Sequence, residues 1–161
     1  MIYEDIIVGS AHDFGAHTFA RDEIKRFATL YDPQYFHTDE DAATASILGG
    51  LCASGWHTAS VMIGLLSRYF HREIERARIE GRPSAPLGPS PGFDDLKWIR
   101  PVFPDDTIRF TGKIVGKRES RSRPEWGLVS IETSGTNQKG EAVFSFTGHV
   151  FVARGIAARS A

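Results

Sequence analysis

The sequence predicts an α+β fold, in which a curved antiparallel sheet wraps around one long central helix. Three features lead to this prediction: an amphipathic helical pattern early in the chain, a longer segment that is apolar on almost every side, and a second half whose apolar residues alternate as in β-strands. The chain contains neither an internal repeat nor a low-complexity segment. We therefore expect its 161 residues to form a single domain, 1–161.

The first helix is expected over residues 21–31. It should end near Asp32, because a residue that precedes a proline, here Pro33, is disfavoured in the helical conformation. The apolar stripe of this helix consists of Ile24, Phe27, Ala28 and Tyr31. Residues 12–20, just before the helix, have the composition of an additional strand.

A short helix should follow over residues 39–46, with Thr38 as its N-cap and Asp41 completing an arrangement like a capping box. A Gly-Gly pair then interrupts the chain before the apolar residues 51–70. Because this segment is apolar almost all the way round, we predict a buried central helix that continues into the charged residues 71–82.

The second half of the chain should form strands after a Pro/Gly-rich loop at residues 83–92. Alternation is clear at Ile108 and Phe110, and again at Phe144 and Phe146. The predicted strands cover residues 93–100, 106–119, 125–136 and 141–153. Short polar turns connect the last three, so we expect an antiparallel meander.

The charge and the cysteine content of the chain exclude several classes of protein. The formal net charge is −1, so there is no overall basic field to attract nucleic acid or an anionic membrane. Cys52 is the only cysteine, which excludes an intrachain disulfide and fits a reducing compartment. The N-terminus is acidic where a signal peptide is basic, and no apolar run is long enough to cross a bilayer. We expect a soluble, cytoplasmic protein.

Motifs for phosphate binding, serine nucleophiles and metal sites are missing. Residues 49–55 are rich in glycine but lack the following lysine of a phosphate loop, and Ser54 lacks the upstream glycine of a nucleophile elbow. The six histidines do not have metal-site spacing, and Cys52 is best interpreted as a small core residue. One stretch of the chain is basic and contains Arg118, Arg121 and Arg123. It fits a solvated hairpin better than a phosphate-binding site.

Asp32 and His37 are the strongest candidates for chemistry. They lie five residues apart on a connection that contains Pro33. Taken alone, Asp32 fits a residue in the C-terminal turn of a helix, and His37 fits a residue next to the N-cap of the following helix. However, Gly55 stands where the next helix should begin, and free backbone N–H groups at a helix N-terminus stabilise negative charge. Two proton-transfer groups and an oxyanion site are what the addition of water to an α,β-unsaturated carbonyl requires.

At these residues the chain resembles the MaoC-like dehydratases, which are enoyl-CoA hydratases with a hot-dog fold. Their signature is Asp-x-Asn-Pro-hydrophobic-His, followed by an acidic helix and by a helix that opens on a small residue and a glycine. In this chain residues 32–37 read DPQYFH, residues 38–43 read TDEDAA and residues 52–58 read CASGWHT. The resemblance extends to residues 3–9 and 95–108, so it covers most of the chain.

The resemblance implies a hydratase/dehydratase that adds water to a 2-enoyl thioester of coenzyme A, or removes it from the 3-hydroxyacyl thioester. Asp32 would be the base toward the attacking water, and His37 would hold the water and help to protonate the product. The backbone N–H of Gly55 would polarise the thioester oxygen. Ser54, beside it, is a further candidate for this oxyanion and substrate site, and both Ser54 and His57 are candidates for supporting the catalytic groups.

The resemblance also sets expectations about partners. Coenzyme A enters as part of the substrate, so no metal or redox cofactor is expected, and neither nucleic acid nor a membrane should bind. Hot-dog sheets pair in homodimers or higher homo-oligomers, with the ligand tunnel between protomers. Two alternatives remain open: a hot-dog acyl-CoA thioesterase, which would not need His37, and a non-catalytic hot-dog protein that binds acyl thioesters.

The chain departs from the family pattern at a few positions. Gln34 and Tyr35 stand where the family has Asn and Pro, and Ile63 stands where some of its hydratases carry serine. These differences bear on substrate preference more than on the reaction. Residues 71–91 form a longer insertion, which we expect to reshape the channel for the acyl group or for coenzyme A.

Overall fold

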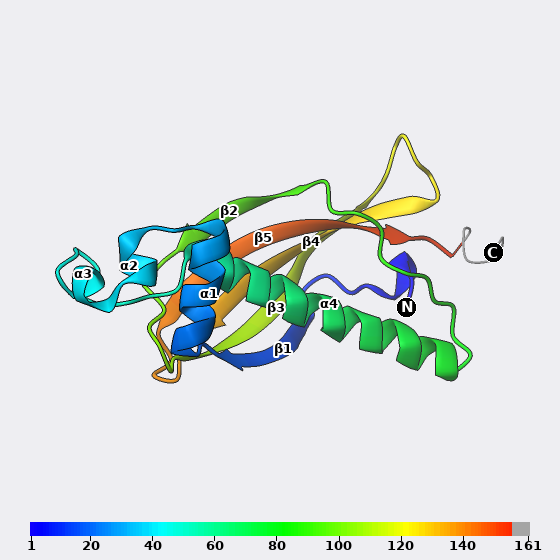
Figure 1. The fold of residues 1–161 in the computed structure, drawn as a ribbon. Coiled ribbons are helices and arrows are strands. Elements are labelled where there is room, and N and C mark those ends of the chain that lie inside the picture. Colours follow the sequence, from blue (N-terminus) through cyan, green and yellow to red (C-terminus); the bar gives the residue numbers. More distant parts are fainter. Residues whose placement is uncertain (156–161) are drawn as a thin grey trace.

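A five-stranded antiparallel sheet curves around one side of the long helix α4 (Figure 1). The computed structural model describes residues 1–155. The strands are β1 (Ala11–Thr18), β2 (Gly92–Trp98), β3 (Thr107–Glu119), β4 (Trp126–Thr136) and β5 (Ala142–Ala153). The helices are α1 (Arg21–Tyr31), α2 (Tyr35–Thr38), α3 (Glu40–Thr44) and α4 (Gly55–Ile79), and a 3₁₀ turn covers Tyr3–Asp5. The α+β prediction is confirmed, with α1, α2 and α3 gathered at the end where α4 begins.

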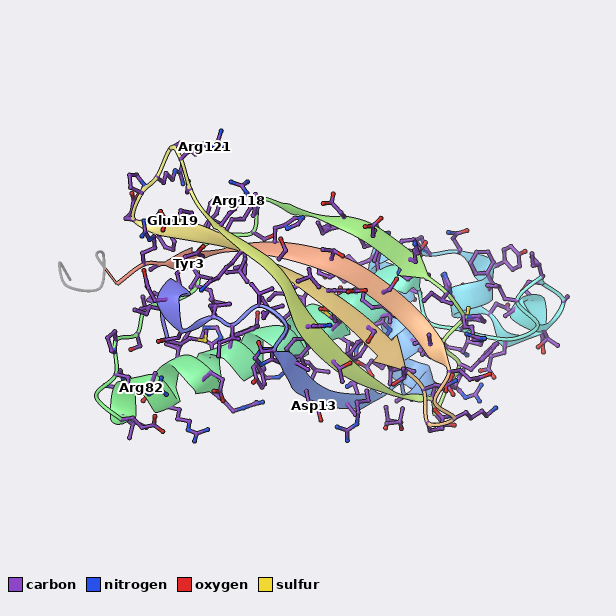
Figure 2. All side chains as sticks on the ribbon, turned by 180° about the vertical axis from the view of Figure 1, so that it is seen from behind. Tyr3, Asp13, Arg82, Arg118, Glu119 and Arg121 are labelled. Carbon is purple, nitrogen blue, oxygen red and sulfur yellow. The ribbon has the colours of Figure 1, made fainter. Side chains whose placement is uncertain are left out.

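The core lies between α4 and the sheet face that α4 covers. Strand β4 illustrates the alternation that builds it, because Val129, Ile131 and Thr133 are buried whereas Glu132 is exposed. The large buried side chains of this layer include Met62, Phe70, Phe110 and Phe144. Burial of each such side chain stabilises the fold by about 1.5–3 kcal/mol. Figure 2 shows the opposite face of the sheet in front, with α4 lying behind it.

Helix α4 is long and continues into the charged segment, as predicted, but it is not buried all the way round. Only one of its sides packs against the sheet, so Trp56 is 50% exposed and Ile63 is 46% exposed. The apolar pattern of this segment therefore predicted more burial than a single chain provides. Within residues 1–155 no helix, α4 included, combines the length and the apolar character needed to cross a membrane.

Three local features differ from the predictions. The connection after Pro33 contains a single helical turn, α2, which the sequence analysis did not predict. The N-cap of α3 is Asp39 rather than Thr38, because the Asp39 carboxylate accepts a hydrogen bond from the Ala42 N–H at 2.9 Å. The last three strands form the expected meander, whereas β2 pairs with β5 and lies at the sheet edge far from β1.

A partly buried polar cluster joins β1, α1 and the first turn of α4. Glu23 on α1 lies 3.0 Å from His17 Nε2 and 3.3 Å from His57 Nε2. The His57 side chain is also stacked on Phe27, with ring centroids 4.6 Å apart. These contacts fix the position of α1, which leads into Asp32, relative to the start of α4.

The chemistry of this cluster determines where its protons lie. A carboxylate can only accept hydrogen bonds, so both Nε2 atoms donate to Glu23. In neutral His57 the Nδ1 atom is then an acceptor, and it is buried without a hydrogen-bond partner among the described residues. Burial lowers the pKa of His57, although Glu23 opposes this effect. Burial tends to raise the pKa of Glu23, but hydrogen bonds from His17 and His57 outweigh it and lower that pKa.

We predict that acid weakens the fold through this cluster. Below pH 6.5, the ordinary pKa of His57, this side chain is protonated more readily in the unfolded chain than in the folded chain. The free energy of unfolding should therefore fall as the pH drops below that value, and should fall further below 4.5, the ordinary pKa of Glu23. His57→Leu should cost about 1–3 kcal/mol at neutral pH and remove the first part of this dependence. Urea unfolding at a series of pH values measures both effects.

His71→Leu is the matched control, because His71 lies exposed on the same helix. Burial also lowers the pKa of His12, but His12 is present in every variant, so the difference between the curves isolates His57. Parallel curves for the wild type and His57→Leu would contradict the prediction.

Candidate active site

The residues singled out in the sequence meet where α1 ends and α4 begins. Helix α1 ends at Tyr31, and Asp32 follows it in a non-helical conformation before Pro33. His37 lies on the single turn α2, and Gly55 is the first residue of α4. The segment before α4 is held by backbone hydrogen bonds from Cys52 N–H to the Phe36 carbonyl and from Ala53 N–H to the Val102 carbonyl. The fold thus brings Asp32, His37, Ser54 and Gly55 together.

Asp32 and His37 face each other. The Asp32 Oδ2 atom lies 3.5 Å from His37 Nε2, and the His37 side chain is almost fully buried. Asp32 also accepts a hydrogen bond at 3.1 Å from the side-chain amide of Gln34. Gln34, which stands where the family has Asn, therefore contacts the Asp32 carboxylate directly.

The backbone determines the orientation of the His37 ring. Its Nδ1 atom lies 2.8 Å from the carbonyl oxygen of Cys52, which can only accept a hydrogen bond, so Nδ1 carries a proton. The Nε2 atom is then the ring nitrogen that is available to another partner. Nε2 faces Asp32, so proton transfer between the two side chains needs no rotation of the ring.

Ser54 connects the carboxylate to the helix. Its hydroxyl donates a hydrogen bond to Asp32 Oδ2 at 2.7 Å and accepts one from the Trp56 N–H at 3.2 Å. It is thus the N-cap of α4, and it is completely buried. With its proton directed at Asp32, the hydroxyl acts on the carboxylate, as expected of a supporting residue. Its assignment to the oxyanion site stays a prediction.

A cavity of about 280 Å³ opens beside His37 and the start of α4. Gly55, Trp98 and Arg100 contribute to its wall, and the remaining wall is mainly apolar, with Phe36, Leu48, Val102 and Val143. Asp32 is not part of the wall. Among the described residues, no hydrogen bond to the Gly55 N–H is present. This N–H group is therefore a free donor at the cavity.

Trp98, at the end of β2, is a site residue that the sequence analysis did not identify. Its indole packs directly on Gly55, so that a Cβ atom at position 55 would lie closer than 3.0 Å to the ring. Even alanine at this position would have to displace the indole. Nothing in the spacing of the sequence relates these two residues, because the contact depends on how β2 meets α4.

Other candidates lie apart from this site or take no part in it. The Cys52 thiol is buried, and burial raises its pKa to about 11, so it is a poor nucleophile. Arg118 and Arg121 lie at the opposite end of the molecule from α2 and α3 (Figure 2). Among residues 1–155, no cluster of three or more His, Cys, Asp or Glu side chains is arranged to hold a metal ion.

A second cavity, of about 340 Å³, lies between α4 and the sheet. Ile63 and Leu66 of α4 contribute to its wall, together with Phe146 of the sheet. Part of the wall comes from the insertion, namely His71, Pro86, Leu87, Gly88 and Ser90. The insertion therefore shapes a mainly apolar cavity next to the central helix.

Comparison with known proteins identifies the family. Residues 8–136 match the model of the MaoC like domain. The chain is similar to the crystal structure of a MaoC-like dehydratase from Rhodospirillum rubrum, with 34% identity, a TM-score of 0.80, and coverage of 96% of this chain and 97% of the other. It also shares the fold of the (R)-hydratase from A. caviae, with 20% identity, a TM-score of 0.69, and coverage of 91% and 97%.

Two curated relatives complete the comparison. YdeM of Bacillus subtilis (strain 168), an uncharacterized protein, is 28% identical over 155 residues, which are 96% of this chain and 100% of YdeM. Mesaconyl-CoA hydratase of Cereibacter sphaeroides is 41% identical over 61 residues, which are 38% of this chain but only 18% of that enzyme. Since the family model spans most of the described structure and the solved relatives share its hot-dog architecture, the chain belongs to the MaoC-like family.

Proposed function

We propose that the protein is a hydratase/dehydratase that interconverts 2-enoyl and 3-hydroxyacyl thioesters of coenzyme A. The observation that carries this proposal is the pairing of Asp32 with His37 Nε2, 3.5 Å apart, beside a cavity that also contains the free Gly55 N–H. Membership of the MaoC-like family supports it. The proposed reaction needs no metal and no redox cofactor.

The proton path follows from the hydrogen bonds. With His37 protonated, its Nδ1 donates to the Cys52 carbonyl, and its Nε2 carries the second proton 3.5 Å from Asp32 Oδ2. In hydration, Asp32 takes a proton from the attacking water as the water oxygen bonds to C3, and His37 delivers its proton to C2. The proton on Asp32 then returns to His37 across the 3.5 Å separation, so the enzyme is restored and one water has been added.

Negative charge on the thioester oxygen needs a donor during this step. As water adds to C3, the carbonyl becomes an enolate whose oxygen carries the charge. We propose that the Gly55 N–H, at the positive end of the 25-residue helix α4, binds that oxygen. In dehydration the same groups act in reverse.

The substrate class is inferred from the relatives and from the cavities. The partial relative named mesaconyl-CoA hydratase supports a coenzyme A thioester. We propose that the second cavity, between α4 and the insertion, receives part of the acyl group or of coenzyme A. A reducing compartment such as the cytoplasm, expected from the single thiol of Cys52, fits this use.

A scan with short- and medium-chain 2-enoyl-CoA thioesters tests the function. Hydration removes the conjugated double bond, so the enoyl absorbance should fall while no free thiol is released. Release of free coenzyme A with the enoyl absorbance retained would favour a thioesterase instead. Binding without either change would favour the non-catalytic alternative.

We predict that Asp32→Asn and His37→Gln each lower kcat for hydration by about 10²-fold or more, the usual contribution of a positioned acid or base. Both side chains lie on the connection between helices, so the circular dichroism spectrum should stay native. Initial rates on the best thioester of the scan measure the effect.

Asp41→Asn is the matched control, since Asp41 is an exposed carboxylate on the nearby helix α3. Its kcat should equal that of the wild type. If Asp32→Asn also turned over at the wild-type rate, the assignment of the base would be wrong.

Ser54 should act through Asp32. Ser54→Ala and Ser54→Gly both remove the hydrogen bond to the carboxylate, and each should lower kcat about tenfold, as expected for a hydrogen bond to a charged group. Only alanine is a poor N-cap, so Ser54→Ala should also lower the stability by about 1 kcal/mol relative to Ser54→Gly. Equal stability with unequal kcat would contradict this division of roles. Steady-state kinetics and urea unfolding measure the two effects.

We propose that the protein forms a homodimer through β2. This strand lies at the edge of the sheet, and Phe93, Trp98 and Ile99 are exposed on or next to it. An unpaired edge with exposed apolar side chains favours pairing with a second copy. Light scattering at micromolar concentration should give the mass of a dimer.

Phe93→Asp should shift this dimer toward monomer. Val115→Asp is the control, because Val115 is similarly exposed but lies on β3, inside the sheet. A monomeric wild type, or equal effects of the two substitutions, would overturn the proposed interface.

A further inference from the structure

The contact between Trp98 and Gly55 has a defined geometry. The three atoms of Trp98 closest to a Cβ built on Gly55 are Cε2, Nε1 and Cδ2, all members of the five-membered ring. A point that is close to three atoms of one small ring lies over the face of that ring. The indole therefore lies with its face against Gly55, at the first residue of α4.

The indole N–H does not point into the helix. This bond lies in the plane of the ring, and the ring face covers Gly55, so the proton is not directed at Gly55. Among the described residues, Trp98 Nε1 makes no hydrogen bond, and the side chain is 48% exposed. Since an indole nitrogen can only donate, a free donor lies next to the Gly55 N–H.

The position of the indole is held by its surroundings. Trp98 pairs with Phe144 in the sheet, and the Ile99 N–H donates to the Val143 carbonyl at 2.9 Å. The Trp56 ring packs edge-on against the indole, with ring centroids 5.2 Å apart. A donor fixed by a strand and by an aromatic neighbour needs little reorganisation when charge develops close to it.

We propose that Trp98 Nε1–H donates a second hydrogen bond to the thioester oxygen, beside the Gly55 N–H. Trp98 and Gly55 both contribute to the wall of the cavity that His37 also lines, so a thioester bound there would lie against both residues. This inference rests on the proposed function. It assigns the oxyanion site to a backbone donor from α4 and a side-chain donor from β2.

Replacement of the indole nitrogen by sulfur distinguishes the effect of the N–H donor from the effect of the ring's shape. Trp98 is exchanged for benzothienylalanine, which keeps the shape and loses only the N–H, and in a second variant for phenylalanine. Both variants should lower kcat for hydration by about 10-fold to 10²-fold with a small change in KM, since loss of one oxyanion donor typically costs up to about 10³-fold. If benzothienylalanine retains the wild-type kcat, Trp98 is only a wall and the inference is overturned.

Binding of butyryl-CoA, a saturated thioester that cannot be hydrated, tests the same contact without turnover. In ¹H–¹⁵N spectra, the Trp98 indole signal and the Gly55 amide signal should both shift, while the backbone amide signal of Arg121, at the opposite end of the molecule, stays in place (Figure 2). A shift at Gly55 without one at Trp98 would overturn the inference and leave the proposed function standing. Shifts at both with no hydration of any enoyl-CoA would support the donor pair and overturn the hydratase function. No shift at either residue would overturn both.

Discussion

One buried hydroxyl determines where the helix begins and where the carboxylate lies. Ser54 has a single proton, which it donates to Asp32 Oδ2 at 2.7 Å, and this leaves its lone pairs for the Trp56 N–H. The start of α4 and the position of Asp32 therefore cannot change independently. Because Asp32 also ends α1, the same atom relates α1 to α4 and holds the carboxylate next to His37.

The two partly buried carboxylates of this region, Glu23 and Asp32, have different hydrogen-bonding and ion-pair partners. Glu23 is held by two imidazole donors, one of which, His57, has its pKa lowered by burial, and the group joins α1 to α4 and to β1. Asp32 has one imidazole partner, at the longer distance of 3.5 Å, whose other nitrogen is committed to a backbone carbonyl. That arrangement leaves Nε2 of His37 facing the carboxylate of Asp32. The Glu23 cluster therefore joins α1 to α4, whereas the catalytic role of the Asp32–His37 pair stays a prediction.

The sequence predicted those features that depend on neighbouring residues. The end of α1 follows from the Asp32-Pro33 step, and the strands follow from alternation that the burial of β3 and β4 reproduces. The turn α2 escaped prediction because four residues are too few to show a helical period. The N-cap of α3 was placed one residue early, since Thr38 and Asp39 are both good caps and only the backbone geometry chooses between them.

The site residues that the sequence analysis singled out lie close together in the chain, whereas Trp98, which it did not identify, lies far from them in the sequence. Asp32, His37, Ser54 and Gly55 belong to one continuous stretch, and the structure brings them together; their catalytic roles stay predictions. Trp98 reaches the site from β2, so its contact with Gly55 depends on the packing of the sheet edge against α4. No local pattern encodes a contact of this kind.

The side of α4 that faces away from the sheet carries apolar residues that the single chain leaves exposed. Trp56 and Ile63 are as apolar as the residues that face the sheet, yet both remain about half exposed in the single chain. Trp56 also packs against Trp98, which borders the cavity beside His37. A second copy that covered this surface would thus shield the cavity from water. Because a hydrogen bond to a developing charge is stronger when water is excluded, the assembly that completes the burial of α4 would also strengthen the donors at its N-terminus.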